Sequence, residues 1–242
     1  MEAGRPLALL GGTFDPVHYG HLRLADEVRR ALAPLEMRLV PARDPPHRGT
    51  PSAGAADRLA MLRLAIDEFP ALLIDERELL RAGKSYTVLT LEELRAEAPR
   101  RPLALVLGAD ALLGLTAWHR WREVLDLAHL VVVARPGTRL AIDDLPPQLR
   151  DEWQGRVQPD AGPLHRTPAG SIVVQPVTPQ PISATAIRAA LARRAVSDVR
   201  GLLPPRVLSY IETHRLYKDL RPDASSPLRR NRRRRPRGHQ GP

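Results

Sequence analysis

The 242-residue sequence contains no cysteine, only two lysines, and no apolar run near the roughly 20 residues that a membrane-spanning helix needs. Without cysteine, the chain forms no disulfide, has no thiol nucleophile and holds no metal through thiolates. Without a long apolar run, it is not expected to cross a bilayer. The N-terminus leads directly into a short strand-like run and lacks the apolar core and cleavage site of a secretory signal, which favours a cytoplasmic location.

Positive charge is concentrated at the C-terminus. Residues 221–242 contain eight arginines and a single acid, Asp223, so this segment carries +7 of the net charge of +10 and leaves +3 for residues 1–220. We predict that 221–242 is a disordered Arg-rich tail, because it has too few apolar residues to bury a core. Contact with nucleic acid or an acidic partner stays open, but the absence of interleaved aromatic residues favours a solvated tail.

Short apolar runs alternate with amphipathic stretches along residues 1–220, as in a parallel sheet covered on both faces by helices. We therefore predict one α/β domain with a doubly wound parallel sheet and a C-terminal helical segment. Residues 136–170, rich in proline and polar residues, are predicted to form an irregular surface excursion. The expected strands are 7–10, 37–40, 72–74, 103–107, 130–134 and 172–174, and the expected helices are 20–33, 55–69, 87–97, 119–128, 185–193 and 204–214.

A glycine turn ends the first expected strand, at the sheet edge where such folds bind ligands. Glycine lets main-chain N–H groups approach an anion without a Cβ in the way, and a helix N-terminus adds partial positive charge. Two histidines on the first turn of that helix can both donate hydrogen bonds to the anion, so the motif predicts a phosphate site. The turn consists of Gly11, Gly12, Thr13 and Phe14, and the histidines are His18 and His21.

Two other interpretations of this motif are disfavoured. The H-x-x-H spacing occurs in metal sites, but no third histidine or acidic ligand follows at helical spacing, which disfavours zinc. The glycines are adjacent rather than spaced as G-x-G-x-x-G, and no acidic residue is placed for a dinucleotide ribose. That departure disfavours an NAD-dependent dehydrogenase.

A second anion-binding motif follows the last expected strand. Ser183 is placed to cap the helix that begins there, and Thr185 and Arg188 follow on its first turns. As structure alone, the serine caps the helix and the arginine faces solvent. As a site, the hydroxyls, the helix N–H groups and a guanidinium that bridges phosphate oxygens bind an anion together. Two anion sites at one sheet edge fit a triphosphate.

The run G-G-T-F-D-P-x-H-x-G-H, with the later I-S-x-T-x-I-R, resembles the nucleotidylyltransferase superfamily. More narrowly, residues 7–218 resemble the nicotinate-nucleotide adenylyltransferases, least of all in 136–170. The resemblance implies a Rossmann-like fold and transfer of AMP from ATP to nicotinate mononucleotide, giving the deamido dinucleotide and pyrophosphate. It also implies in-line attack by the acceptor phosphate without a covalent intermediate. The stretches that narrow the resemblance from the superfamily to this family are 41–48, 75–79, 85–91, 108–110, 118–121 and 128–132.

The resemblance also implies roles for individual residues on the donor side. His18 and His21 would contact the ATP phosphates and stabilise the transition state as catalytic residues. Mg²⁺ is expected to accompany ATP, held mostly by phosphate oxygens and water. Gly108 and Asp110 fit the nucleotide ribose. The other ATP-binding residues implied are Gly11, Gly12, Thr13, Phe14, Ser183, Thr185 and Arg188, of which the last three would hold the β and γ phosphates.

On the acceptor side, the resemblance places the pyridine ring against Trp118, because a flat cation stacks well on indole. It places the nicotinate carboxylate beside Tyr86 and Thr87. His47 and Arg48 are candidates for the acceptor phosphate, although as loop residues they are equally consistent with solvated side chains. The charged run at 75–78 suits an ion-paired or solvated turn, because a phosphate nucleophile is already ionised and needs no strong base.

Other functions stay open on the sequence alone. Another adenylyltransferase or cytidylyltransferase of the superfamily shares the first motif, though such enzymes commonly differ at its first histidine or lack the Ser-Tyr-Thr block. A class I aminoacyl-tRNA synthetase has an H-x-G-H signature, but this chain is short and has no lysine-bearing second motif. A nucleic-acid-binding protein would work through the tail. The sequence does not indicate the oligomeric state or the preference between acid and amide acceptors.

Overall fold

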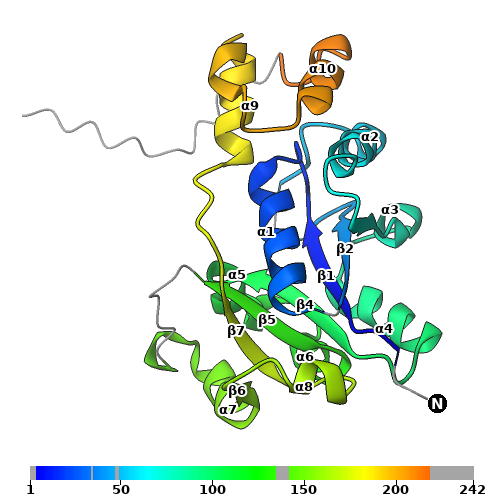
Figure 1. Ribbon diagram of the computed structural model, residues 1–242, viewed down its shortest axis with the longest axis vertical. Helices are drawn as coiled ribbons and strands as arrows, with labels where there is room; N and C mark the ends of the chain where they lie inside the picture. Colours follow the sequence, from blue (N-terminus) through cyan, green and yellow to red (C-terminus); the bar gives the residue numbers. More distant parts are fainter. Residues whose placement is uncertain (1–3, 34, 47–48, 135–141, 219–242) are drawn as a thin grey trace, which may run out of the picture.

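A seven-stranded parallel sheet organises the computed structural model, which describes residues 4–33, 35–46, 49–134 and 142–218. The strand order is β3-β2-β1-β4-β5-β7-β6, and every pairing is parallel. The order confirms the doubly wound sheet (Figure 1). The strands are β1 (Leu7–Gly12), β2 (Glu36–Pro41), β3 (Leu72–Ile74), β4 (Leu103–Gly108), β5 (His129–Ala134), β6 (Val157–Gln158) and β7 (Ile172–Pro176).

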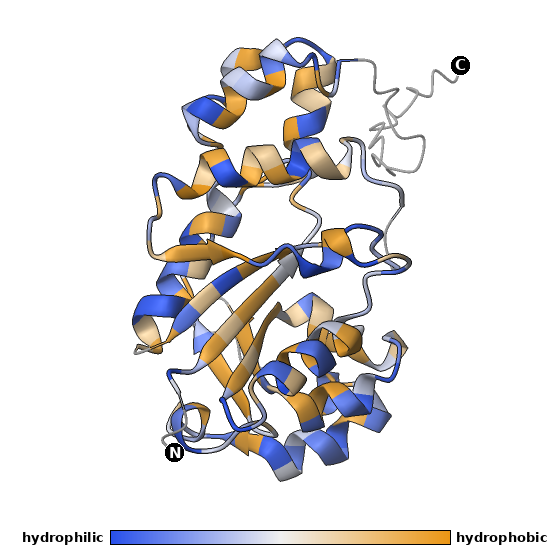
Figure 2. Ribbon diagram, turned by 90° about the vertical axis from the view of Figure 1, so that its right-hand side faces the viewer, coloured by the Kyte–Doolittle hydropathy of each residue, from blue (hydrophilic) through white to orange (hydrophobic). Residues whose placement is uncertain are grey.

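Helices cover both faces of the sheet, because its strands are apolar on both sides. In β1, Ala8 packs into one apolar cluster, whereas Leu7 and Leu9 pack into the other. Figure 2 shows the strands as largely hydrophobic and the helices as mixed. The helices are α1 (Tyr19–Ala31), α2 (Ala55–Ile66), α3 (Arg77–Leu80), α4 (Thr87–Glu97), α5 (Ala109–Leu113), α6 (Trp121–Leu127), α7 (Pro147–Arg156), α8 (Pro163–Arg166), α9 (Ala184–Ala192) and α10 (Pro205–Thr213).

The expected elements are all present, with ends shifted by no more than three residues. The expected C-terminal helical segment consists of α9 and α10, and in Figure 1 the β1 arrow points toward it. The short helices α3 and α5 were not expected, since four or five residues are too few to show a helical period. None of the described helices is long and apolar enough to cross a membrane.

The expectation of an irregular excursion at 136–170 was wrong for much of that segment. It contains α7, α8 and the short strand β6, which pairs with β7. Leu145, Leu149 and Trp153 recur at intervals of four and are buried together on one apolar cluster. Three apolar residues among many polar ones give too weak a pattern to recognise without the sheet against which they pack. Residues 135–141 and the tail 221–242 lie outside the described residues.

Candidate active site

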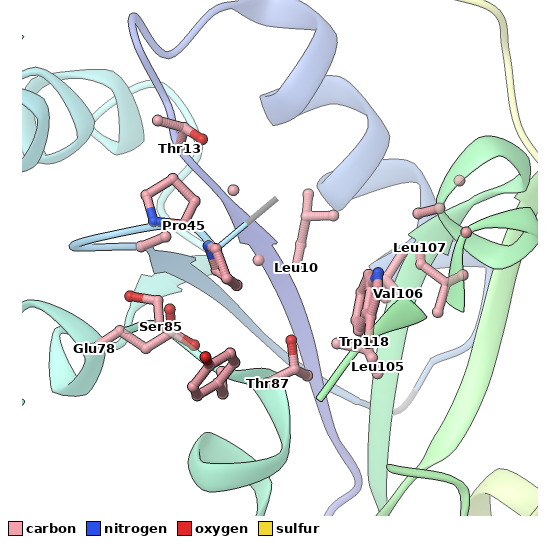
Figure 3. Close-up of a pocket in the computed structure, with 18 of the residues that line it drawn as sticks. Leu10, Thr13, Pro45, Glu78, Ser85, Thr87, Leu105, Val106, Leu107 and Trp118 are labelled. Carbon is pink, nitrogen blue, oxygen red and sulfur yellow. The ribbon is translucent and has the colours of Figure 1, made fainter. Parts of the chain in front are cut away.

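A cavity of about 640 Å³ opens at the carboxyl ends of β1 and β4. The chain runs outward from β1 through β2 and β3, then returns to β4 on the other side, so this is the point where the strand order reverses. Crevices at such points are the usual ligand sites of open α/β sheets. Figure 3 shows Glu78 and Ser85 on one side of the cavity and Trp118 on the other. The structure gathers these expected site residues along its wall: Gly11, Gly12, Thr13, Tyr86, Thr87, Gly108, Asp110 and Trp118.

The two histidines lie at the start of α1 and are not among the residues that line the cavity. His18 occupies the N-cap position, and its ring stacks on His21 with 3.8 Å between centroids. Burial lowers the pKa of His18 to about 4, so its imidazole is neutral at pH 7 and each nitrogen is either a donor or an acceptor. Gly20 makes room for this ring, because a Cβ there would lie 2.9 Å from His18.

Phe14 is a core residue rather than a cavity residue. Its side chain is 1% exposed, and its ring meets the edge of His21 at a centroid distance of 5.1 Å. A Cβ on Gly12 would lie 2.9 Å from the Phe14 ring, so that glycine is needed for close packing of the turn. The phenyl ring therefore packs against His21 in the core.

The second anion-binding motif packs against the first. Ser183 caps α9 as expected, with its hydroxyl accepting from the Ala186 N–H at 3.5 Å. Arg188 donates to the Asp15 carbonyl at 2.6 Å and to the Thr185 hydroxyl at 3.3 Å. The guanidinium therefore faces the glycine turn and not bulk solvent. The hydroxyls of Ser183 and Thr185 belong to exposed residues beside it.

A buried carboxylate beneath the turn was missed in the sequence. Asp15 accepts hydrogen bonds from the Ser52 N–H at 2.7 Å, the Ala53 N–H at 3.1 Å and the Tyr217 hydroxyl at 2.7 Å. Burial and the adjacent Asp15 raise the pKa of Tyr217, which keeps the phenol as a donor. The end of the C-terminal segment is thereby tied to the phosphate turn. No local pattern connects two residues that lie this far apart along the chain.

The wall of the cavity that contains the expected acceptor residues Tyr86 and Thr87, which we call the acceptor wall, is built around the N-terminus of α4. Tyr86 is the N-cap residue of that helix, and its ring lies 4.4 Å from His119 between centroids. Behind it, Glu78 accepts a 2.7 Å hydrogen bond from the Thr90 hydroxyl, and burial raises the pKa of this carboxyl. His119 and Glu78 line the cavity and were not among the expected site residues.

The charged run at 75–78 is ion-paired in part, as expected. Asp75 forms ion pairs with Arg77 at 2.8 Å and with Arg38 at 3.0 Å. Glu78, at the end of the run, is buried at the cavity wall instead of solvated. The helix α3 begins at Arg77 and turns this last carboxylate inward, which the run of charges does not show. The remaining acceptor candidates, His47 and Arg48, lie outside the described residues.

The low pKa of His18 predicts a specific sensitivity to acid. Its folded-state pKa is about 4 and its ordinary value is 6.5, so between these values the unfolded chain binds a proton that the folded chain does not. Stability is therefore lost as the pH falls through this window. Between pH 7 and pH 5 this residue should cost about 2 kcal/mol of unfolding free energy. His18→Gln removes this contribution, so urea unfolding should show a smaller loss for the variant.

A second buried histidine, His129, contributes equally to the acid sensitivity of wild type and variant, so the difference between the two proteins reports on His18 alone. It is buried, its Nε2 contacts the Thr167 carbonyl at 2.8 Å, and its Nδ1 accepts from the Ser171 N–H at 3.1 Å. Burial lowers the pKa of His129 too, so it destabilises both proteins in acid by the same amount. An equal loss of stability in wild type and His18→Gln would contradict the low pKa assigned to His18.

A glycine turn, adjoining anion motifs and a cavity at the reversal of strand order are features of a nucleotidyltransferase, and residues 9–190 match the cytidylyltransferase-like family model. The chain is 51% identical over 203 residues to the probable nicotinate-nucleotide adenylyltransferase of Halorhodospira halophila, covering 84% of this chain and 91% of that one. It is 47% identical over 215 residues to that of Dechloromonas aromatica, covering 88% and 98%. The chain belongs to the nicotinate-nucleotide adenylyltransferase family.

Solved structures agree at the level of fold. The nicotinic acid mononucleotide adenylyltransferase of Plasmodium falciparum, complexed with NaAD, matches with a TM-score of 0.66 and 16% sequence identity. The match covers 88% of this chain and 97% of the other. A second structure of that protein, complexed with APC, matches with a TM-score of 0.64.

Proposed function

We propose that this protein transfers AMP from ATP to nicotinate mononucleotide, giving nicotinate adenine dinucleotide and pyrophosphate, as a step of NAD biosynthesis. One observation carries the proposal: a single cavity is bounded by a phosphate-type glycine turn on one side and by a helix N-terminus facing an indole on the other. The first wall suits a nucleoside triphosphate, and the second suits an anionic aromatic acceptor. The names of the relatives support the same pair of substrates.

The donor wall would hold ATP by its phosphates. The glycine turn lines the cavity, and the two histidines stack on each other at the start of α1, where the Tyr19 N–H already donates to the Leu202 carbonyl. Ser183, Thr185 and Arg188 would take the β and γ phosphates, since Arg188 already reaches the turn at Asp15. Gly108 and Asp110, at the end of β4, would contact the ribose.

The reaction would proceed by direct in-line attack of the acceptor phosphate on the α-phosphorus of ATP, with pyrophosphate leaving. The nucleophile is already ionised, so no general base is needed and the protein acts by alignment and by charge stabilisation. His18 and His21 would donate hydrogen bonds to phosphate oxygens as negative charge builds on the α-phosphate and the leaving group. Because His18 is neutral, it would donate through one ring nitrogen only.

We propose further that Mg²⁺ enters with ATP and takes its ligands from phosphate oxygens and water, as this ion commonly does. It would neutralise charge on the polyphosphate. In the part of the chain that the structure describes, no group of three or more His, Cys, Asp or Glu side chains is placed to hold a metal ion.

The test is dinucleotide formation by the full chain and by a chain ending at residue 220. We expect both chains to form one pyrophosphate for each dinucleotide from ATP and nicotinate mononucleotide. The turnover numbers of the two chains should agree within about twofold. The shorter chain keeps Tyr217, whose hydroxyl holds Asp15, and loses only the Arg-rich segment. If neither chain turns over and the full chain binds RNA tightly, the nucleic-acid-binding alternative replaces the enzyme proposal.

A further inference from the structure

Arg58 is the largest of the fully buried side chains and lies at the start of α2, directly beneath the cavity loops. Its exposed fraction is 1%. The guanidinium donates to four main-chain carbonyls, on Thr13 at 2.7 Å, Ala42 at 2.7 Å, Arg43 at 3.3 Å and Ala53 at 3.3 Å. These carbonyls belong to three separate segments: the glycine turn, the loop after β2 and the turn before α2.

The side chain is placed to hold main chain and not to pair with an acid. Among the described residues, no carboxylate lies within ion-pair distance of Arg58. Burial is the largest influence on its pKa, Asp15 and Tyr217 oppose it, and both Asp15 oxygens already accept bonds from Ser52, Ala53 and Tyr217. Burial lowers the pKa of Arg58, but a guanidinium stays protonated in proteins and so keeps all its donors.

The bonds to the carbonyls of Ala42 and Arg43 also orient the N–H groups of the same two peptides, which belong to Arg43 and Asp44. In a trans peptide, the carbonyl and the following N–H point in opposite directions. With the carbonyls turned toward Arg58, the next two N–H groups face the acceptor wall, where Arg43 donates to the Ser85 hydroxyl at 2.9 Å and Asp44 donates to it at 3.3 Å. Residues 42–44 are therefore held from two sides.

Ser85 connects this arrangement to the acceptor wall. It is buried and immediately precedes Tyr86 and Thr87, which line the cavity at the start of α4. Thr13 lies at the donor wall. One guanidinium thus links the donor wall directly to residues 42–44, and these residues link it to the acceptor wall.

We propose that Arg58 is a positioning residue that sets the separation and angle between the donor and acceptor walls, and hence the alignment of the acceptor phosphate with the α-phosphate of ATP. The kinetic part of this inference rests on the function proposed above. Arg58 is not among the residues that line the cavity. A lysine in its place keeps the charge but has no planar fork, so it cannot reach all four carbonyls.

Arg95 offers a matched control at the other end of the sheet. It is half-buried, burial lowers its pKa, and its guanidinium also bonds main-chain carbonyls. None of its partners lines the cavity. The partners are the carbonyls of Ala98, Pro99, Arg101, Leu127 and Pro168. Arg95→Lys therefore removes the same kind of interaction without moving the walls.

The experiment compares full-length wild type, Arg58→Lys and Arg95→Lys in steady-state kinetics, at a temperature well below each melting point. We expect Arg58→Lys to lower kcat about 30-fold while KM for both substrates changes less than about threefold, because misalignment slows the chemical step and each wall still binds its own substrate. Arg95→Lys should keep kcat within about twofold although it also lowers the melting temperature. Equal losses of kcat in both variants, or an unchanged kcat in Arg58→Lys, would overturn the proposal.

Ser85→Ala provides a second route if Arg58→Lys does not fold. It releases residues 43–44 from the acceptor side and should lower kcat about tenfold, and an unchanged kcat would count against the proposal. Where Arg58→Lys does fold, the double variant should lose less than the product of the two single losses, because both act on the same segment. If the loss of kcat in the double variant equals the product of the two single losses, the linkage is contradicted.

Amide hydrogen exchange gives a readout without activity. The Arg43 and Asp44 amides should be protected in wild type and in Arg95→Lys, and should exchange at least about tenfold faster in Arg58→Lys. If wild type forms no dinucleotide, the proposed function fails, and exchange then tests the Arg58 linkage by itself. Unchanged protection in Arg58→Lys would refute the linkage whatever the substrate.

Discussion

His21→Ala is expected to lower kcat about 10³-fold while KM for ATP changes less than about threefold. An N–H donor aimed at a phosphate oxygen gains strength as negative charge builds during attack, so its loss is felt in the transition state more than in substrate binding. The ring is well held for that role, since it stacks on His18 and meets the edge of Phe14. Steady-state rates of dinucleotide formation at varied ATP measure both constants.

His214→Ala is the matched control for this variant. His214 also stacks on a neighbouring ring, that of Tyr210, with 3.9 Å between centroids, but it is exposed and lies in the C-terminal segment away from the cavity. Its removal should leave kcat within about twofold. His21→Gln, which retains a side-chain N–H, should recover part of the lost rate. A wild-type kcat in His21→Ala would refute the transition-state role of this histidine.

The strands and the cavity walls could be predicted because their signals are local. A strand buried on both faces is a short apolar run, as in β4 and β5, and its carboxyl end is a position that the sequence itself marks. Gly11 and Gly108 lie at such ends and were expected at one edge, where the structure places both around the cavity, whereas Trp118 was expected in the site only from the family resemblance. Parallel topology brings the two local patterns into one site.

The supporting residues beneath the walls could not be predicted, because their partners are set only by the complete fold. Arg58 binds carbonyl groups, which every residue possesses, so its neighbours in the sequence do not distinguish it from an arginine on a helix surface. Asp15 and Tyr217 meet across nearly the whole chain. In the sequence, Glu78 resembles the other residues of a charged turn, and only the helix α3 shows that its side chain is buried. The partners and the burial of each of these polar side chains depend on contacts between distant parts of the chain, which leave no periodic pattern in the sequence.

We predict that the acceptor wall binds a carboxylate better than an amide. The first N–H groups of a helix have no partner within it, and the helix dipole places partial positive charge there. In α4, which is 11 residues long, this end coincides with Tyr86 and Thr87 at the cavity wall, and Trp118 on the far side provides a surface for the pyridine ring. An anion placed at that helix end would accept bonds from main-chain N–H groups and from the Thr87 hydroxyl.

We therefore expect kcat/KM for nicotinate mononucleotide to exceed that for nicotinamide mononucleotide about 10³-fold. An amide would turn its own N–H₂ toward these donors and leave at least one of them unpaired in a desolvated site, and each hydrogen bond to a charged group contributes about 1.5–3 kcal/mol. Thr87→Val should reduce the ratio about tenfold by removing one donor. Thr178→Val, the same change at an exposed hydroxyl that contacts Glu27 far from the cavity, should leave the ratio unchanged. Equal rates with the two acceptors would show that the helix terminus does not bind the group on the pyridine ring.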